Sequence, residues 1–234
     1  MKHEPENLTL AHEEAPESRT DKGVGSGRLL GVLPRPYYED AHVTLYHGDC
    51  REIVPLLGRF DLMLTDPPYG LKDKLQGGTW GKAYEGEDKD WDHSTVAELE
   101  TLRQCADMQV IWGGNYYPLP PTRCWLVWNK PQRGLTMADA EIAWVSRDGN
   151  IRVFDSSRNP DGKRDHPTQK PLGLMTWCIA QFPHAKTIID PFAGSGTTGR
   201  AAKDMGRKCV LIEREQKYCD VIVRRLAQEV LPFA

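Results

Sequence analysis

Short apolar runs alternate with amphipathic segments from Tyr37 onward. The runs that predict strands are residues 41–49, 60–66, 108–114, 124–130, 141–147, 185–190 and 208–215. The segments that predict helices or helical turns are residues 50–58, 93–106, 171–182, 197–206 and 216–230. The run FDLMLTD (60–66) is nearly continuous, as expected for a strand buried on both faces of a parallel sheet. Strands that alternate with helices predict one doubly wound α/β sheet, with ligand sites at the carboxyl ends of the strands.

Three stretches lack a clear period. Residues 1–36 are acidic and then glycine-rich, which predicts a flexible tail before one domain at 37–234. The G-x-G-x-G of this tail follows no strand, which argues against a dinucleotide loop. Residues 70–92 predict a long mobile loop of the kind that often borders an active site. Residues 146–165 are polar and basic.

Composition changes this picture little. Hydrophobic residues are 39% and charged residues 27% of the 234 residues, as in an ordinary globular protein. No apolar run approaches the roughly 18 residues of a membrane span, and the N-terminal segment lacks the apolar core of a secretory signal. We therefore expect a cytoplasmic protein. A net charge of −3 argues against a protein that coats nucleic acid, although a local basic patch is sufficient for binding DNA.

The six cysteines are scattered, and none forms a C-x-x-C pair. No cluster of histidines accompanies them. This spacing predicts neither a structural metal nor a disulfide framework, so no metal is expected. Most of the cysteines are expected to be small buried apolar residues.

Four predicted strands end in unusual residues. The ends read GDC (48–50), TDPPYG (65–70), DPFAGSGTTG (190–199) and LIERE (211–215). Gly, Pro and Asp form turns in many proteins, so ordinary turns are the alternative explanation. Strand ends in an open α/β sheet meet at one crevice, which favours a shared binding site.

The segment DPFAGSGTTG predicts a ligand loop at the start of a helix. Its glycines allow close approach of a ligand to backbone N–H groups. It lacks the lysine of a phosphate-binding loop and the spacing of a dinucleotide loop. Asp190 before the loop suits a cationic ligand group, and Glu213 at the next strand end has the spacing of a residue that bonds both hydroxyls of a ribose. S-adenosylmethionine has both groups.

The turn Asp66–Pro67–Pro68–Tyr69 suits chemistry on an amine. The exocyclic amine of a nucleobase is a poor nucleophile because its lone pair is delocalised into the ring. Two hydrogen-bond acceptors, the Asp66 carboxylate and the Pro67 carbonyl, would localise that lone pair. The prolines remove competing N–H donors, and Tyr69 can stack on the base. The alternatives are a carboxylate that caps the strand end and an amphipathic surface ring.

Together these motifs resemble the β group of DNA amino-methyltransferases, in which the catalytic strand precedes the cofactor loop. TDPPYG resembles the catalytic motif, DPFAGSGTT the cofactor loop, HPTQKP (166–171) the motif upstream of that loop, and HGDC (47–50) an adenine contact. The resemblance spans residues 42–228. It implies a Rossmann-like methyltransferase fold with circularly permuted motifs, S-adenosylmethionine as cofactor, S-adenosylhomocysteine as product, and flipping of the target base out of the duplex.

The resemblance also implies roles for individual residues. Asp190 would face the methionine ammonium, Glu213 the ribose, Asp49 and Cys50 the adenine edge, and Thr168 and Lys170 the methionine carboxylate. His166 is equally well explained as a contact at the start of the helix. The remaining cofactor residues would be Gln169, Phe192, Ala193, Gly194, Ser195, Gly196, Thr197 and Thr198.

The target base is less well defined. Relatives that act on N6 of adenine usually carry Asp at the first position of the catalytic motif, and those that act on N4 of cytosine usually carry Ser. Asp66 therefore favours adenine, with cytosine as the alternative. A methyltransferase acting on RNA or a protein amide is disfavoured, since those enzymes carry Asn there. The intact motifs argue against a silent binding module.

DNA recognition is predicted from the polar segment 146–165, a short candidate target-recognition region. Its cations, which either contact phosphates or coat a solvated hairpin, are Arg147, Arg152, Arg158, Lys163 and Arg164. So small a region suggests a short target, a homodimer or relaxed specificity. An enzyme paired with a restriction endonuclease, an orphan enzyme and a phage-type modification enzyme fit the sequence equally well.

Overall fold

The computed structural model describes residues 32–70, 95–134, 138–158, 160 and 169–228. Contacts divide the chain into Met1–Leu30 and Gly31–Ala234, and only the second unit contains described residues. Its strands are β1 (Tyr38–Glu39), β2 (Val43–His47), β3 (Phe60–Thr65), β4 (Ala106–Trp112), β5 (Trp125–Asn129), β6 (Ala140–Val145), β7 (Arg152–Asp155), β8 (Thr187–Asp190) and β9 (Lys208–Glu213). Its longer helices are α4 (Leu172–Ala180), α5 (Thr197–Asp204) and α6 (Gln216–Leu226). Shorter helical segments are α1 (Cys50–Ile53), η1 (Val54–Leu56), α3 (Leu99–Leu102), η4 (Arg103–Cys105) and η5 (Gly114–Tyr116).

The described strands form one mixed sheet in the order β1-β2-β9-β8-β3-β4-β6-β5-β7. The pairs β2–β9, β9–β8, β8–β3, β3–β4 and β5–β7 are parallel. The pairs β1–β2, β4–β6 and β5–β6 are antiparallel. The mostly parallel, doubly wound sheet predicted from the sequence is confirmed.

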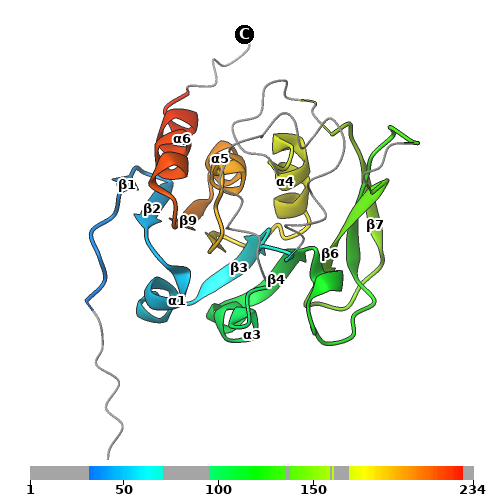
Figure 1. Cartoon of the computed structure of the whole chain (residues 1–234), viewed down its shortest axis with the longest axis horizontal. Coiled ribbons are helices and arrows are strands. Elements are labelled where there is room, and N and C mark those ends of the chain that lie inside the picture. The colour runs from blue at the N-terminus through cyan, green and yellow to red at the C-terminus, as the bar shows by residue number, and fades with distance from the viewer. Residues whose placement is uncertain (1–31, 71–94, 135–137, 159, 161–168, 229–234) are drawn as a thin grey trace, which may run out of the picture. The chain divides into compact units, whose positions relative to one another are not determined.

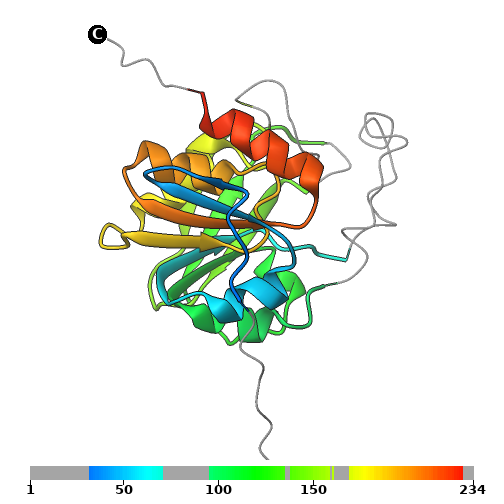
Figure 2. The same ribbon diagram turned by 90° about the vertical axis from the view of Figure 1, so that its left-hand side faces the viewer.

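Helices cover both faces of the sheet (Figure 1). Residues of α4, α5 and α6 pack on one face in the largest hydrophobic cluster, which also takes in Leu62, Leu64 and Trp112. A second cluster on the other face joins α1 to Met63 and Ile189. Figure 2 shows the same layers from the side, with the sheet between α6 and α1. Side chains of β3 are buried toward both faces, which explains its nearly continuous apolar sequence.

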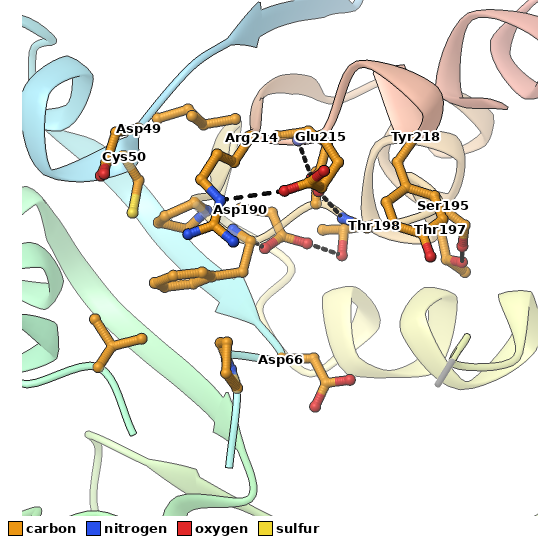
Figure 3. A pocket seen from close by; sticks show the side chains of 18 of the residues that line it. Asp49, Cys50, Asp66, Asp190, Ser195, Thr197, Thr198, Arg214, Glu215 and Tyr218 are labelled. Atoms are coloured by element: carbon orange, nitrogen blue, oxygen red, sulfur yellow. Dashed lines mark hydrogen bonds and ion pairs between the residues drawn. The ribbon is translucent and has the colours of Figure 1, made fainter. Parts of the chain in front are cut away.

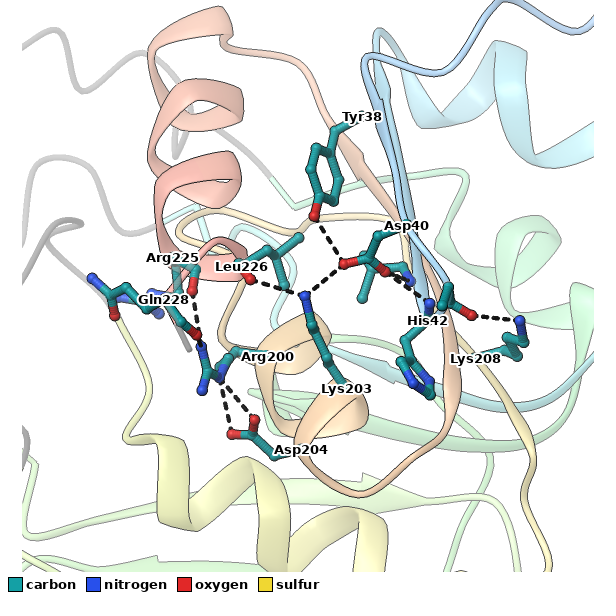
Figure 4. A network of polar contacts seen from close by, with 12 residues as sticks. Tyr38, Asp40, His42, Arg200, Lys203, Asp204, Lys208, Arg225, Leu226 and Gln228 are labelled. Atoms are coloured by element: carbon teal, nitrogen blue, oxygen red, sulfur yellow. Dashed lines mark hydrogen bonds and ion pairs between the residues drawn. The ribbon is translucent and has the colours of Figure 1, made fainter. Parts of the chain in front are cut away.

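Polar contacts fasten the first strands to the last helices (Figure 4). The Lys203 ammonium on α5 donates to Asp40 at 2.6 Å and to the Leu226 carbonyl at 2.9 Å. Burial raises the pKa of Asp40, but Lys203 and two backbone N–H groups outweigh it and lower that pKa. Arg200 donates to the carbonyls of Arg225 and Gln228 at the end of α6. These bonds hold the C-terminal helix against α5 and the N-terminal edge of the sheet.

The elements depart from the sequence predictions at several places, and the short strand β1 and the helical turn η5 are among the elements that were not predicted. The helix predicted at 93–106 is reduced within its described part to the α-helix α3 and the 3₁₀ turn η4. The segment 146–165 contains β7, which the sequence did not predict. Its side chains are mostly exposed at the edge of the sheet, so it lacks an apolar signal.

The cysteine prediction is confirmed for five of the six, since Cys50, Cys124, Cys178, Cys209 and Cys219 are buried thiols. Cys105 is half-buried. Among the described helices, none is long and apolar enough to cross a membrane.

Gly114 sits where the end of β4 meets β6, and a side chain there has no room. A Cβ at this position would lie 2.4 Å from Cβ of Trp144 and 3.1 Å from its backbone nitrogen. We predict that Gly114→Ala lowers the free energy of unfolding by about 1–3 kcal/mol because β6 must shift. Urea denaturation measures this change. Gly58→Ala is the control, since a Cβ there meets nothing within 4 Å, and equal stability of the two variants would contradict the prediction.

Candidate active site

Four strand ends meet at the carboxyl edge of the sheet. The strands β2, β9, β8 and β3 are parallel neighbours, so the residues that follow them lie side by side. They line a cavity of about 470 Å³ (Figure 3). This volume lies in the usual range for small-molecule sites. The cavity borders the junction of β8 and β3, where the order of the strands reverses, and such switch points hold the ligands of open α/β sheets.

The glycine loop after β8 is shaped by backbone bonds. Gly196 lies at φ +74°, a left-handed conformation, and precedes the first turn of α5. A Cβ on Gly196 would lie 2.8 Å from Cγ1 of Ile222, so glycine is required for packing as well as for conformation. The Gly196 amide donates to the Ala193 carbonyl at 2.8 Å, and the Ala193 amide donates to the Ile212 carbonyl at 3.0 Å. The loop is thereby held between α6 and β9.

Asp190 joins the catalytic strand to this loop. Its Oδ1 accepts hydrogen bonds from the Thr65 hydroxyl at 2.7 Å and the Phe192 amide at 3.1 Å. Its Oδ2 accepts from the Thr198 hydroxyl at 2.6 Å. Burial raises the pKa of Asp190 to about 6, and these donors only partly offset the shift. Asp190 lines the cavity, as expected, and its contact with a cofactor ammonium stays a prediction.

Glu213 ends β9 and lines the same cavity. Its Oε2 accepts from the Gly194 amide and its Oε1 from the Glu215 amide, both at 2.8 Å. Burial raises the pKa of Glu213 to about 7, against the opposing effect of these donors. The two bonds orient the carboxylate and tie the glycine loop to the end of β9.

Asp49 and Cys50 lie across the cavity from α6 (Figure 3). Asp49 caps α1 by accepting from the Arg51 amide at 2.8 Å and also pairs with the Arg51 guanidinium. Arg51 lowers the pKa of Asp49. Burial raises the pKa of the Cys50 thiol to about 12, so this thiol is neutral.

The predicted catalytic turn that follows β3 holds Asp66 in a network. The Tyr69 hydroxyl donates to Asp66 Oδ1, and Lys170 Nζ lies 2.5 Å from Asp66 Oδ2. The Tyr69 ring stacks on Tyr116 with 5.0 Å between centroids and an interplanar angle of 21°. Tyr117 anchors the turn by donating to the Pro68 carbonyl. Asp66 and Pro68 line the cavity, so the turn and the glycine loop border one space.

Lys170 has partners in the structure that the sequence did not predict. The resemblance implied that it meets a methionine carboxylate, and it does line the cavity. In the structure its ammonium also contacts Asp66 at 2.5 Å and Glu141 Oε2 at 3.1 Å. Glu141 in turn pairs with Lys130, which follows β5. The motifs of the sequence predict no role for Glu141, Lys130 or Tyr116, which lie in the segments 138–144, 125–130 and 111–117.

The remaining predicted residues are placed as follows. Among the cofactor residues, those on the cavity wall are Gln169, Phe192, Ala193, Gly194, Ser195, Thr197 and Thr198. Ser195 and Thr197 also accept hydrogen bonds from Arg225 of α6. His166, Thr168, Lys163 and Arg164 lie outside the described residues. Within the described residues, no group of three His, Cys, Asp or Glu side chains is arranged to hold a metal ion.

The three described cations of the polar segment lie apart. Arg147 follows β6 and packs over the Phe182 ring at 4.5 Å, near the beginning of β4. Arg152 is exposed on β7 and pairs with Leu126 of β5. Leu126 pairs with Ala143 of β6, which pairs with Trp112 at the end of β4. Arg152 is therefore level with the end of β4, which lies beside the end of β3. Arg158 donates to the Ala138 carbonyl at 2.9 Å. Arg152 and Arg158 are therefore nearer than Arg147 to the carboxyl edge of the sheet, where the cavity lies.

Comparison with known proteins gives consistent matches. The DNA methylase family matches residues 109–224, from β4 to α6. The chain is 28% identical to the type II methyltransferase M.ScaI of Streptomyces caespitosus, across 85% of this chain and 86% of that protein. It is 29% identical to the type II methyltransferase M.HinfI of Haemophilus influenzae, across 81% of this chain and 69% of that protein.

Two solved structures share the fold. The complex of M1.HpyAVI with S-adenosylmethionine superimposes with a TM-score of 0.55 at 23% identity, over 80% of this chain and 100% of that one. The cytosine-N4-specific PvuII DNA methyltransferase superimposes with a TM-score of 0.58 at 17% identity, over 84% of this chain and 90% of that one. The Rossmann-like methyltransferase fold expected from the motifs is confirmed by these likenesses.

The raised pKa of Glu213 predicts a pH-dependent stability. The pKa of the Glu213 carboxyl group is about 7 in the folded protein and lower in the unfolded chain. This difference stabilises the folded protein fully at pH values below the pKa of the unfolded chain. This contribution is lost as the pH rises from about 4 to 7. We predict that Glu213→Gln reduces the fall in unfolding free energy between pH 5 and 8 by on the order of 1–3 kcal/mol.

Denaturant titrations at a series of pH values measure this effect. Glu52→Gln makes the same chemical change at an exposed position and serves as the control. A pH dependence of Glu213→Gln identical to that of the wild type would contradict the prediction.

Proposed function

Because the chain belongs to the N6/N4 DNA methylase family, we propose that it transfers a methyl group from S-adenosylmethionine to the N6 amine of adenine in DNA. One observation carries this proposal. The turn at Asp66 and Pro68 and the glycine loop at Gly194 and Ser195 border a single cavity. A target amine and a methyl donor bound there are therefore adjacent, and alignment of two reactants supplies a large part of a methyl-transfer rate.

The residues of the cavity fit S-adenosylmethionine. The Glu213 carboxylate is oriented by two backbone amides and presents acceptors suited to the ribose hydroxyls. Cys50, Phe192 and Ile212 supply an apolar wall suited to an adenine ring. Asp190 is a buried carboxylate suited to a cationic amino group. When bound, the cofactor supplies an electrophilic methyl group on a sulfonium sulfur.

Asp66 and Pro67 prepare the amine. An ionised carboxylate has roughly four acceptor positions, and Tyr69 and Lys170 occupy two of those on Asp66. Asp66 therefore keeps capacity to accept one N–H of the target amine. The Pro67 carbonyl accepts the other, and neither Pro67 nor Pro68 offers a competing N–H. The two acceptors localise the nitrogen lone pair toward the methyl group, and Asp66 takes the proton that the amine releases.

Aromatic residues beside the turn receive the flipped base. A base in a duplex must leave the stack to reach Asp66. Tyr69 is held by its hydrogen bond to Asp66, and Tyr116 stacks on it with 45% of its surface exposed. Tyr116 thus extends the aromatic surface from the catalytic turn toward solvent. Stacking of a base on such a ring contributes roughly 1–3 kcal/mol.

Adenine is preferred over cytosine because Asp66 occupies the first position of the motif. The cytosine-N4 reaction is the second candidate, since the same two acceptors suit either amine and the PvuII enzyme has the same fold. A homodimer and a restriction endonuclease partner stay predictions.

Labelled S-adenosylmethionine tests the reaction directly. We expect tritium to transfer to unmethylated genomic DNA, and nucleoside analysis to recover it in N6-methyladenine. Label in N4-methylcytosine would establish the second candidate. The absence of transfer to any duplex or single strand would contradict both.

Removal of the Asp66 carboxylate separates catalysis from cofactor binding. We predict that Asp66→Ala slows single-turnover transfer by about 10²- to 10⁴-fold, because the amine loses its acceptor. Calorimetry should find cofactor affinity nearly unchanged, since Glu213 and the glycine loop stay intact. Asp107→Ala, which removes an exposed carboxylate paired with Arg59, is the control. Wild-type rates in Asp66→Ala would exclude this turn as the catalytic one.

Arg152 and Arg158 are proposed to contact DNA phosphates. We predict that Arg152→Ala and Arg158→Ala each reduce the slope of log Kobs against log salt concentration by roughly 0.9, one phosphate contact each. Fluorescence anisotropy with a labelled duplex at several salt concentrations gives the slopes. Arg59→Ala, which removes an exposed cation before β3, is the control. Slopes equal to that of the wild type would remove these arginines from the interface.

A further inference from the structure

Four charged side chains of alternating sign form a row of ion pairs that begins at Asp66 in the turn after β3. Lys170 Nζ lies between Asp66 Oδ2 at 2.5 Å and Glu141 Oε2 at 3.1 Å. The other Glu141 oxygen, Oε1, pairs with Lys130. The two lysine side chains are 6% and 5% exposed, while Asp66 and Glu141 are partly buried. The four residues come from four segments: the turn after β3, the residues just before α4, β6 and the residue after β5.

The arrangement gives Lys170 one more partner than a simple ion pair needs. A buried ammonium must be paired to be tolerated, and Asp66 alone would satisfy that requirement. Glu141 competes for the same ammonium and is itself fixed by Lys130. The positive charge facing Asp66 is therefore divided between a carboxylate that borders the cavity and one that does not.

We propose that Glu141 is a positioning residue for methyl transfer: it shares the Lys170 ammonium with Asp66 and so leaves the Asp66 carboxylate able to accept the target amine. This inference rests on the proposed function, because the role of Glu141 is defined relative to Asp66 as the amine acceptor. Glu141 acts through Lys170 and contacts neither reactant.

The pKa shifts of Asp66, Glu141 and Lys170 agree with this division. Burial raises the pKa of Asp66, and Lys170 only partly offsets that shift. Burial also raises the pKa of Glu141, but Lys170 and Lys130 outweigh it and hold that pKa at about 2. Burial lowers the pKa of Lys170, but the two carboxylates outweigh it and the net shift is upward. Asp66 is thus the more basic carboxylate of the two, as a proton acceptor should be.

Other titratable or charged side chains face these ion pairs from the elements packed around them. They are Tyr69 of the turn, Tyr116 of η5, Asp190 of β8, Cys178 of α4 and Arg158 after β7. Burial raises the pKa of Tyr69 well above its usual value, and burial raises that of Cys178, so both are neutral near pH 7. The variants below leave all five unchanged.

Substitutions of Glu141 and Lys170 are expected to move the pH profile in opposite directions. Glu141→Gln leaves Lys170 to Asp66 alone, which lowers the pKa of Asp66 and weakens it as an acceptor. The acid limb of single-turnover transfer should move down by about one pH unit, and the plateau rate should fall roughly tenfold. Lys170→Gln removes the cation, and the acid limb should move up.

A matched variant guards against misfolding. Glu141→Gln leaves Lys130 without its carboxylate, and an unpaired buried cation destabilises a protein. The double variant Lys130→Met/Glu141→Gln removes both charges of that pair and should show the same downward shift. Neither residue lines the cavity, so calorimetry should find unchanged affinity for S-adenosylmethionine in both variants.

A readout without turnover separates this inference from the proposed function. Carboxyl ¹³C NMR of the ligand-free protein reports the pKa of Asp66, which should fall in Glu141→Gln and rise in Lys170→Gln. An unshifted Asp66 pKa, or a uniformly slower rate with the wild-type acid limb, would overturn the role of Glu141. Failure of the wild type to methylate unmethylated genomic DNA would overturn the proposed function, and the NMR titration would still decide the electrostatic coupling.

Discussion

The geometry of the cavity depends on the hydrogen bonds that the buried Asp190 carboxylate accepts. This carboxylate accepts hydrogen bonds from Thr65, which directly precedes Asp66, and from Thr198 in the first turn of α5. One buried group therefore fixes β3 and the glycine loop relative to each other. Because both partners are hydroxyls within secondary structure, Thr65 in β3 and Thr198 in α5, the spacing of the turn after β3 and the glycine loop is set by these two elements. Such rigid spacing is what alignment of two reactants requires.

The same edge of the sheet concentrates groups that are costly to bury. Burial raises the pKa of Asp190 to about 6 and of Glu213 to about 7, so ionisation of these carboxylates near neutral pH opposes folding. Their backbone and hydroxyl donors limit this cost without removing it. Perturbed carboxylates gathered at one cavity are characteristic of functional sites, whose geometry is kept at some expense of stability.

The sequence predicted what depends on local pattern and missed what depends on contacts across the sheet. The buried strands are apolar runs and α5 and α6 are amphipathic, and the predicted cofactor residues of the glycine loop other than Gly196 lie on the cavity wall. β7 was not predicted because an exposed edge strand has no apolar stripe. Glu141 reads as one polar residue in a strand, and only the fold brings it to Lys170, which is 29 positions away in the printed sequence.

The position of β3 in the sheet has a consequence for how such a protein can diversify. On one side of β3 lie β8, β9, β2 and β1, and the strand ends of β8, β9 and β2 with the residues that follow them line the cavity. On the other side lie β4, β6, β5 and β7, which carry Tyr116, Glu141 and the exposed arginine of the edge strand. The two wings share β3 as their common boundary. Residues of β7, the outermost strand of the second wing, do not line the cavity, so substitutions there change the outer edge of the sheet while the cavity walls built on the first wing stay intact.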